Sequence, residues 1–222
     1  MTAIEIIKKV RDEGFCIFKL PESLVQKIAN SRVGDFSDGF YINNEEHLSI
    51  IKDIPVIKEL EEEMRQEANQ RKYDFNEIHV VRSVESNSNE RLRTHFDSHL
   101  YTIVLPSQLP DPVGEDFGQL YMVPCKRRRP SSDLNNLVSK LPSFLYRGRT
   151  GMKLLRRNKG YLEINLGKDE GIVFEGMVCL HGNKPNLTVQ KRVTLISHYI
   201  DPFPKGAGAL MRSIRKFFGT RK

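Results

Sequence analysis

Two short segments of the chain carry side chains that together could bind a metal ion. His95 and Asp97 lie two residues apart in the run Arg93-Thr94-His95-Phe96-Asp97. Side chains two apart on an extended chain point to the same side, so this imidazole and this carboxylate can share one ion. A third donor has to come from elsewhere, and His181 is the candidate because it follows an apolar run and precedes a turn.

Two imidazoles and one carboxylate form a facial set that suits iron(II) and leaves coordination positions open. Those positions can take the keto oxygen and adjacent carboxylate of 2-oxoglutarate, together with dioxygen. The far carboxylate of this diacid needs a fixed cation, and Arg192, 11 residues after His181, has the planar fork for bidentate binding. Thr194, on the same expected strand face as Arg192, can add a hydroxyl donor.

Five ordered segments resemble the iron(II)/2-oxoglutarate-dependent dioxygenase family. They read H-F-D at 95–97, G-Q-L-Y-M-V-P at 118–124, G-I-V-F-E-G at 171–176, H-G-N-K-P at 181–185 and R-V-T at 192–194. The resemblance covers about residues 77–200 and implies a double-stranded β-helix core. Residues 14–20 are similar to the opening of phytanoyl-type members.

The resemblance also implies roles for individual residues. Iron(II) would be bound by His95, Asp97 and His181, and 2-oxoglutarate by Arg192, with Thr194 and Tyr101 as weaker candidates. The implied reaction uses O2 to decarboxylate 2-oxoglutarate to succinate and to hydroxylate an unactivated carbon. Because Asp97 leaves no site for halide, hydroxylation is favoured over halogenation. The insertion at 126–160 departs from the family pattern, so no relative's substrate can be transferred to this chain.

Each of these residues has a structural alternative, and the chain has alternative functions. His95 could be a core-edge histidine bonded to Asp97, His181 a turn residue, and Arg192 a surface cation. The second hypothesis is a noncatalytic metal-binding β-helix module, and the third is a hydroxylase of a soluble small molecule. Further pocket candidates are His99, Arg82 and Arg93, while His79 and His198 are expected to be structural.

The predicted elements that must position these residues change along the chain, from mainly helices to mainly strands. Helical spacing covers residues 3–12, 22–30 and 55–73, with a strand expected over 14–20. From residue 75 onward, short apolar runs predict antiparallel strands at 77–84, 99–105, 119–123, 161–166, 171–174 and 192–200. The expected fold is α+β, mainly β: a cupin-like jelly roll at 75–200, backed by helices within 1–74, in one domain of 222 residues.

The composition is that of a soluble globular protein, with 39% hydrophobic and 28% charged residues. The N-terminus lacks the apolar stretch of a secretory signal, so a cytoplasmic protein is expected. The three cysteines have no C-x-x-C spacing and are interpreted as reduced packing residues.

Two segments carry the positive excess behind the net charge of +7. Residues 126–159 contain 11 basic residues and one acid, and residues 203–222 contain six basic residues and no acid. Short helices are expected near 134–141 and from Met152, and an amphipathic helix over 207–219.

These segments predict an anionic partner. The favoured partner is the inner face of an anionic membrane. Nucleic acid is disfavoured because no aromatic residues interleave the cations. The alternative is an oligomer contact together with a solvated loop. One branch of the family that the chain resembles fits this charge pattern, the oxygenases that hydroxylate the acidic sugar Kdo of lipid A, and the resemblance implies Kdo as a candidate substrate.

Overall fold

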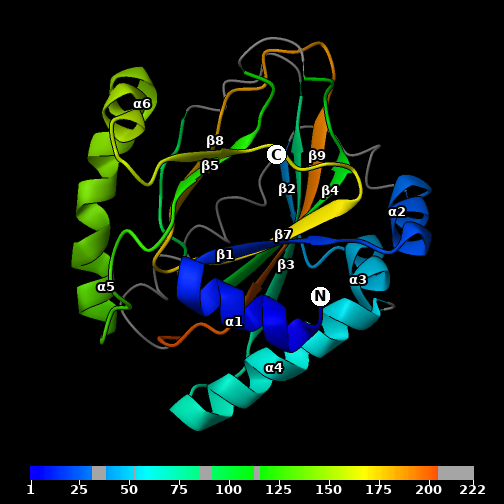
Figure 1. The fold of residues 1–222 in the computed structure, drawn as a ribbon, viewed down its shortest axis with the longest axis horizontal. Coiled ribbons are helices and arrows are strands. Elements are labelled where there is room, and N and C mark those ends of the chain that lie inside the picture. The colour runs from blue at the N-terminus through cyan, green and yellow to red at the C-terminus, as the bar shows by residue number, and fades with distance from the viewer. Residues whose placement is uncertain (32–38, 53, 86–91, 113–115, 205–222) are drawn as a thin grey trace.

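The computed structural model describes residues 1–31, 39–52, 54–85, 92–112 and 116–204 (Figure 1). Its helices are α1 (Ala3–Glu13), α2 (Glu22–Ala29), α3 (Glu45–Lys52), α4 (Pro55–Arg71), α5 (Asp133–Lys140) and α6 (Gly148–Arg156), with a 3-10 helix, η2, over Leu141–Tyr146. Its strands are β1 (Phe15–Lys19), β2 (Gly39–Ile42), β3 (Glu77–Val84), β4 (Tyr101–Gln108), β5 (Leu120–Val123), β6 (Leu162–Ile164), β7 (Glu170–Glu175), β8 (Leu180–Asn183) and β9 (Arg192–Tyr199).

The N-terminal helix is defined at both ends by local chemistry. Thr2 and Glu5 form a capping box, in which each side chain accepts a hydrogen bond from the other residue's backbone N–H. The helix ends at Gly14, whose φ of 89° is left-handed and lets the chain turn directly into β1. The buried face of α1 consists of Ala3, Ile6, Ile7 and Val10. The expected helix and following strand are confirmed.

Two antiparallel sheets make up the β part of the structure. The larger has the strand order β1-β7-β4-β9-β3-β2, and the smaller has the order β6-β5-β8. In the larger sheet β4 lies between β7 and β9, with Thr102 opposite both Phe174 and His198. Figure 1 shows α1 and α4 crossing on one side of this arrangement, while α5 and α6 lie on another side, next to β5 and β8.

The two faces of the larger sheet have different neighbours. Tyr101 of β4 and Tyr199 of β9 are paired, and their hydroxyls donate to Glu67 and Glu61 of α4. This face therefore contacts the helices. On the opposite face, the Phe174 ring makes an edge contact with His181 of β8, with centroids 4.7 Å apart. The space between the two sheets is thus bordered by alternate residues of β4, β7 and β9.

The insertion forms the helical segment α5–η2–α6. The Ser132 hydroxyl caps α5 by accepting a hydrogen bond from the Asn135 N–H at 3.2 Å, as expected for a serine at this position. The inner side of α6 packs on the small sheet, where Met152 and Leu155 join a cluster with Tyr121, Val123 and Leu180. The expected helix at Met152 begins earlier, at Gly148.

Most expected elements are found close to their predicted bounds, and β3 matches residues 77–84. The sequence patterns did not predict β2, α3 or β8, which are short. The expected helix over 207–219 lies outside the described residues. Within the described part of the chain, no helix has the length and apolar character needed to cross a bilayer.

Candidate metal site

Two reciprocal backbone hydrogen bonds place His95 beside His181. The N–H of His95 donates to the carbonyl of His181 at 2.9 Å, and the N–H of His181 donates to the carbonyl of His95 at 3.0 Å. This isolated antiparallel bridge links the segment before β4 to β8. The two imidazole centroids lie 4.5 Å apart. Histidines that are distant in the sequence therefore face the same space.

Asp97 completes the group. Its Oδ1 lies 3.5 Å from His95 Nε2, and its Oδ2 lies 3.5 Å from His181 Nε2. One potential ligand atom from each residue lies within 4.8 Å of the other two. Donors that each lie about 2 Å from one ion are separated by about 3 Å, so small side-chain adjustments would let one ion contact all three. The structure thus brings together the three residues expected to bind iron.

Backbone carbonyls orient both imidazoles. The Nδ1 of His95 lies 2.7 Å from the carbonyl oxygen of Arg93, and the Nδ1 of His181 lies 3.0 Å from that of Cys179. A carbonyl only accepts hydrogen bonds, so each Nδ1 carries a proton when its ring is neutral. The lone pair of each ring is then on Nε2, the atom that faces Asp97. Histidines that bind a metal through one ring nitrogen usually donate a hydrogen bond from the other in this way.

Thr102 and Gly176 hold Asp97 in place. The Thr102 hydroxyl donates to Asp97 Oδ2 at 2.6 Å, and the Asp97 N–H donates to the Gly176 carbonyl at 2.9 Å. A Cβ on Gly176 would lie 2.7 Å from Asp97 Oδ2 and 2.8 Å from the Thr102 hydroxyl. Only glycine allows this close approach.

The protonation states of Asp97 and His181 suit a metal ligand set. Burial alone would raise the pKa of Asp97, but the nearby His181 and His198 imidazoles hold it well below its usual range. Burial lowers the pKa of His181 to about 4. At neutral pH Asp97 is therefore ionised and His181 is neutral, so neither has to lose a proton to bind a cation.

Arg192 and Thr194 lie on the site-facing side of β9. Both are buried, and they share this strand face with His198, which lies beside Asp97. A Cβ at Gly118 would lie 2.8 Å from Arg192 Cδ, so a glycine makes room for the arginine stem. The Thr194 hydroxyl is buried and has no hydrogen-bond partner among the described residues. An unpaired buried hydroxyl is costly unless a ligand satisfies it.

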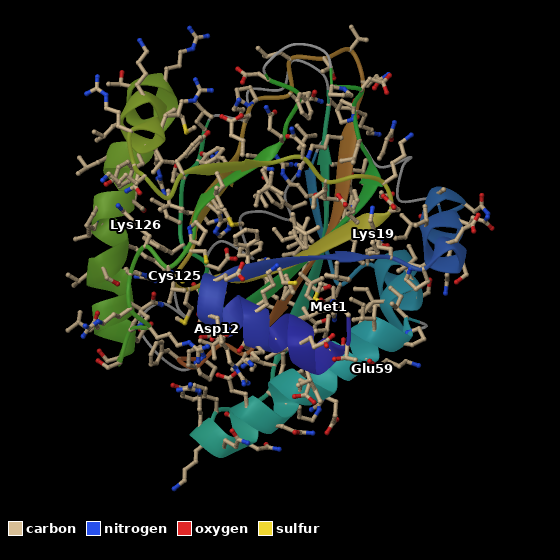
Figure 2. All side chains as sticks on the ribbon, viewed as in Figure 1. Met1, Asp12, Lys19, Glu59, Cys125 and Lys126 are labelled. Carbon is tan, nitrogen blue, oxygen red and sulfur yellow. The ribbon has the colours of Figure 1, made fainter. Side chains whose placement is uncertain are left out.

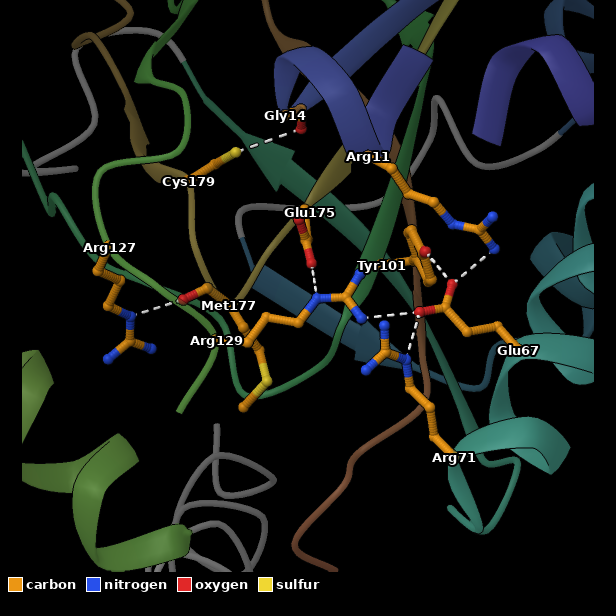
Figure 3. Close-up of polar contacts among 10 residues, drawn as sticks. All are labelled: Arg11, Gly14, Glu67, Arg71, Tyr101, Arg127, Arg129, Glu175, Met177 and Cys179. Atoms are coloured by element: carbon orange, nitrogen blue, oxygen red, sulfur yellow. Dashed lines mark hydrogen bonds and ion pairs between the residues drawn. The ribbon is translucent and has the colours of Figure 1, made fainter. Parts of the chain in front are cut away.

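The expectation that Tyr101 binds the co-substrate is wrong. Tyr101 lies on the helix-facing side of β4, and its hydroxyl makes a short hydrogen bond to Glu67 of α4 (Figure 3). Glu67 also accepts from Arg129 at 2.7 Å, Arg71 at 2.8 Å and Arg11 at 3.0 Å. Arg129 in turn contacts Glu175, which precedes Gly176. Tyr101 therefore belongs to a buried ionic cluster behind the sheet.

His198 was expected to have a structural role, but it lies at the candidate site. Its Nδ1 lies 3.0 Å from the Thr102 hydroxyl and 3.7 Å from Asp97 Oδ2. Its ring stacks on His99, with centroids 5.1 Å apart. A signal was present, because His198 continues the alternation that places Arg192 and Thr194 on one face. His99 thus lies near the site through His198.

The insertion borders the candidate site. The Lys140 ammonium donates to the Ser98 hydroxyl at 3.0 Å, one residue from Asp97. The Arg127 guanidinium lies over the Phe96 ring, 4.1 Å from its centroid. Two cations of the insertion therefore contact the segment that carries His95 and Asp97.

The other two pocket candidates make different contacts. The Arg82 guanidinium lies over the Phe40 ring, 4.0 Å from its centroid, and donates to the Gly39 carbonyl at 3.1 Å. Arg82 is directly opposite Thr194 in the sheet and shares its face. Arg93 is exposed, and its carbonyl accepts the His95 hydrogen bond.

Comparisons with known proteins give similarity at the level of structure. No family model and no curated protein matches the sequence. Among solved structures, EvdO2 from Micromonospora carbonacea var. aurantiaca complexed with 2-oxoglutarate matches with a TM-score of 0.56 and 13% identity, over 89% of this chain and 90% of that one. A Pseudomonas putida prolyl-4-hydroxylase matches with a TM-score of 0.53 and 14% identity, over 90% of this chain and 95% of that one.

A third similar structure is the non-heme alpha ketoglutarate dependent carbocyclase SnoK from nogalamycin biosynthesis. It has a TM-score of 0.53 and 13% identity, over 90% of this chain and 86% of that one. Similarity at such low identity concerns the fold, and it agrees with the two facing antiparallel sheets. The chain has the double-stranded β-helix fold, as do 2-oxoglutarate-dependent oxygenases of known structure.

Proposed function

We propose that the chain is an iron(II)- and 2-oxoglutarate-dependent dioxygenase that hydroxylates an unactivated carbon. The observation that carries this proposal is the convergence of His95, Asp97 and His181 in a double-stranded β-helix. Their two nitrogens and one oxygen match the facial donor set that suits iron(II). Similar folds occur in proteins described as alpha ketoglutarate dependent or complexed with 2-oxoglutarate.

The protein's part in this reaction is to hold the metal and to fix the orientation of the side chains that bind it. His95, Asp97 and His181 would hold the metal from one side, with both rings fixed by carbonyl oxygens and the carboxylate fixed by Thr102. When bound, iron and 2-oxoglutarate supply the oxidative chemistry, in which O2 converts 2-oxoglutarate to succinate and CO2 while a C–H bond becomes C–OH.

Arg192 and Thr194 would bind the far carboxylate of 2-oxoglutarate. A guanidinium can bind a carboxylate through two parallel hydrogen bonds, and a neighbouring hydroxyl can donate a third. The Thr194 hydroxyl supports this assignment, because it has no hydrogen-bond partner within the described part of the chain and an anionic oxygen would supply one. Both residues are buried, which strengthens charged hydrogen bonds relative to those in water.

The substrate we propose is anionic, with the acidic Kdo sugar of lipid A as a specific candidate. Support comes from the excess of cations in residues 126–159 and from Lys140, which lies next to the segment of Asp97. Incubation with a Kdo-containing lipid A precursor and mass spectrometry would test it. A product heavier by one oxygen would support Kdo, and its absence would remove this substrate without affecting the proposed reaction class.

The proposed chemistry can be tested without a known substrate. Anaerobic addition of iron(II) and 2-oxoglutarate should give the weak visible charge-transfer band of the chelate, and admission of air should give succinate. A noncatalytic module that keeps a metal for structure would bind iron without forming this band or releasing succinate. That outcome would overturn the proposed function.

A further inference from the structure

Helix α5 presents its apolar residues to solvent. Leu134, Leu137, Val138 and Leu141 occupy positions i, i+3, i+4 and i+7, so they lie on one helical face, and all four are exposed. A helix packed on a globular core normally buries this face. The exposed row continues into η2 with Phe144 and Leu145.

The inner side of α5 is polar. Asn136 is buried, and its side-chain oxygen accepts from the Arg127 guanidinium at 2.9 Å. Arg127 also contacts the Ser139 hydroxyl and donates to the Met177 carbonyl at 2.6 Å. Burial lowers the pKa of Arg127 to about 10, so the guanidinium remains charged at neutral pH. Hydrogen bonds to a fixed cation thus hold α5 in place and leave its apolar side outward.

Exposed cations are numerous in the same insertion. They are Lys126, Arg128, Arg147, Arg149, Lys153, Arg156, Arg157 and Lys159, whereas the one acid of the insertion, Asp133, is only half-exposed. The Arg147 guanidinium lies over the Phe144 ring, 3.9 Å from its centroid. Figure 1 shows α5 and α6 in line along one side of the molecule, and Figure 2 shows side chains projecting outward from this side.

We propose that the outer side of α5–η2, together with the exposed cations of the insertion, docks on the surface of an anionic lipid bilayer. Apolar side chains at headgroup depth and cations near anionic headgroups are the two components of interfacial attachment. Long basic side chains can keep their charges at the headgroups while leucines enter the boundary. We call Leu134, Leu137, Val138, Leu141, Phe144 and Leu145, together with the eight cations, the docking surface.

Charge disfavours two other occupants of this surface, namely a second copy of the chain and the chain's own residues 205–222. A second copy of the chain would bring two basic surfaces together, and residues 205–222 contain six further cations and no acid. Like charges in contact oppose the binding of a second copy and the binding of residues 205–222. An anionic bilayer instead attracts both basic segments. The proposal does not depend on the oxygenase reaction, because bilayer binding requires neither metal nor co-substrate.

Vesicle binding of the full chain tests this proposal. Vesicles of phosphatidylcholine mixed with phosphatidylglycerol should bind the protein, and vesicles of phosphatidylcholine alone should bind it much more weakly. The double variant Leu137→Ser/Leu141→Ser should lower binding by about tenfold or more, since each leucine removed from the boundary loses its transfer free energy. Leu187→Ser is the matched control, because Leu187 and Leu141 are both 59% exposed.

A second pair of variants tests the charges. Arg149→Gln/Lys153→Gln should weaken binding to anionic vesicles, whereas Lys8→Gln/Lys58→Gln, on the exposed sides of α1 and α4, should not. Equal binding by all variants would show that another segment attaches the protein, and it would overturn the proposal. A dimer in light scattering that Leu137→Ser/Leu141→Ser abolishes would assign the surface to a second copy and would overturn it too.

Discussion

Gly176 lies so close to Asp97 that a Cβ at position 176 would come within 2.7 Å of the carboxylate oxygen Oδ2. The same glycine accepts the backbone hydrogen bond of Asp97. The position of the Asp97 carboxylate therefore depends on the absence of a side chain at position 176, directly after β7.

Gly176→Ala should displace the Asp97 carboxylate or the Thr102 hydroxyl. We expect a loss of about 1–3 kcal/mol in the free energy of unfolding from overpacking, together with weaker iron(II) binding. Urea denaturation and anaerobic iron titration would measure the two effects. Gly160→Ala is the control, because a Cβ there would have ordinary contacts at 3.6 Å. Unchanged iron affinity in Gly176→Ala would show that Asp97 does not need its present position.

Asp97→Asn should abolish most of the iron binding while preserving the fold. The amide keeps the shape of the carboxylate but removes the negative charge. We expect affinity to fall by more than about a hundredfold, which exceeds the usual effect of changing a residue that only hydrogen-bonds to a metal ligand. Equilibrium dialysis with metal analysis would measure it. His79→Gln is a control on the helix-facing side of the sheet, where His79 Nδ1 lies 2.9 Å from the Ser197 hydroxyl. Equal loss in both variants would point to unfolding.

Thr194→Val should have opposite effects on the free protein and on co-substrate binding. In the protein without co-substrate, the change removes a buried hydroxyl that lacks a partner among the described residues, so the melting temperature should stay the same or rise. The affinity for 2-oxoglutarate should fall by about tenfold, as for loss of a hydrogen bond to a charged group. Thr194→Ser should restore most of this affinity. A lower melting temperature with unchanged affinity would contradict the assignment.

Arg192→Lys should weaken 2-oxoglutarate binding although it keeps a positive charge. The ammonium cannot reproduce the bidentate fork, and we expect an affinity loss of about tenfold or more. Isothermal titration in the presence of anaerobic iron(II) would measure it. Unchanged affinity would mean that the far carboxylate is bound elsewhere.

Glu67→Gln should destabilise the fold in a pH-dependent way. Burial opposes the charge of Glu67, but Arg129 and Tyr101 outweigh it and lower the pKa of Glu67 from 4.5 to about 2. A carboxyl whose pKa is lower in the folded state contributes stability above its unfolded pKa, and this contribution is lost as the pH falls from about 4.5 towards 2.

We therefore expect Glu67→Gln to cost about 2–4 kcal/mol at pH 7, as for breaking a buried ion pair. The cost should shrink as the pH falls below about 4.5. Chemical denaturation at several pH values would measure it. A cost that is the same at low and neutral pH would mean that the charge of Glu67 is not what stabilises the cluster.

Local alternation explains which site residues could be predicted from the sequence. His95 and Asp97 lie two apart, as do Arg192 and Thr194, and each pair shares a side in the structure. Tyr101 was assigned to the co-substrate from the family resemblance, but residues 98–100 form a bend between Asp97 and β4. Alternation does not carry across a bend, so Thr102 faces the site and Tyr101 faces α4.

Long-range pairing explains what could not be predicted. Arg127 and Arg129 were counted among the basic residues predicted to meet an anionic partner, yet both are partly buried, with Arg127 bonded to Asn136 and Arg129 to Glu67 and Glu175. Glu67 and Glu175 are remote in the sequence, and no local pattern indicates either contact. The proximity of His95 to His181 is equally nonlocal, and it was predicted from the need of a metal ion for a third donor and from the family resemblance.

Anomalous X-ray diffraction at the iron edge, from crystals prepared without oxygen in iron(II) and 2-oxoglutarate, would locate the metal and the co-substrate directly. We expect one iron peak in contact with His95 Nε2, His181 Nε2 and Asp97, with 2-oxoglutarate density extending from the iron to Arg192 and Thr194. An empty map between these three side chains, or an iron peak bound by other residues, would contradict this expectation.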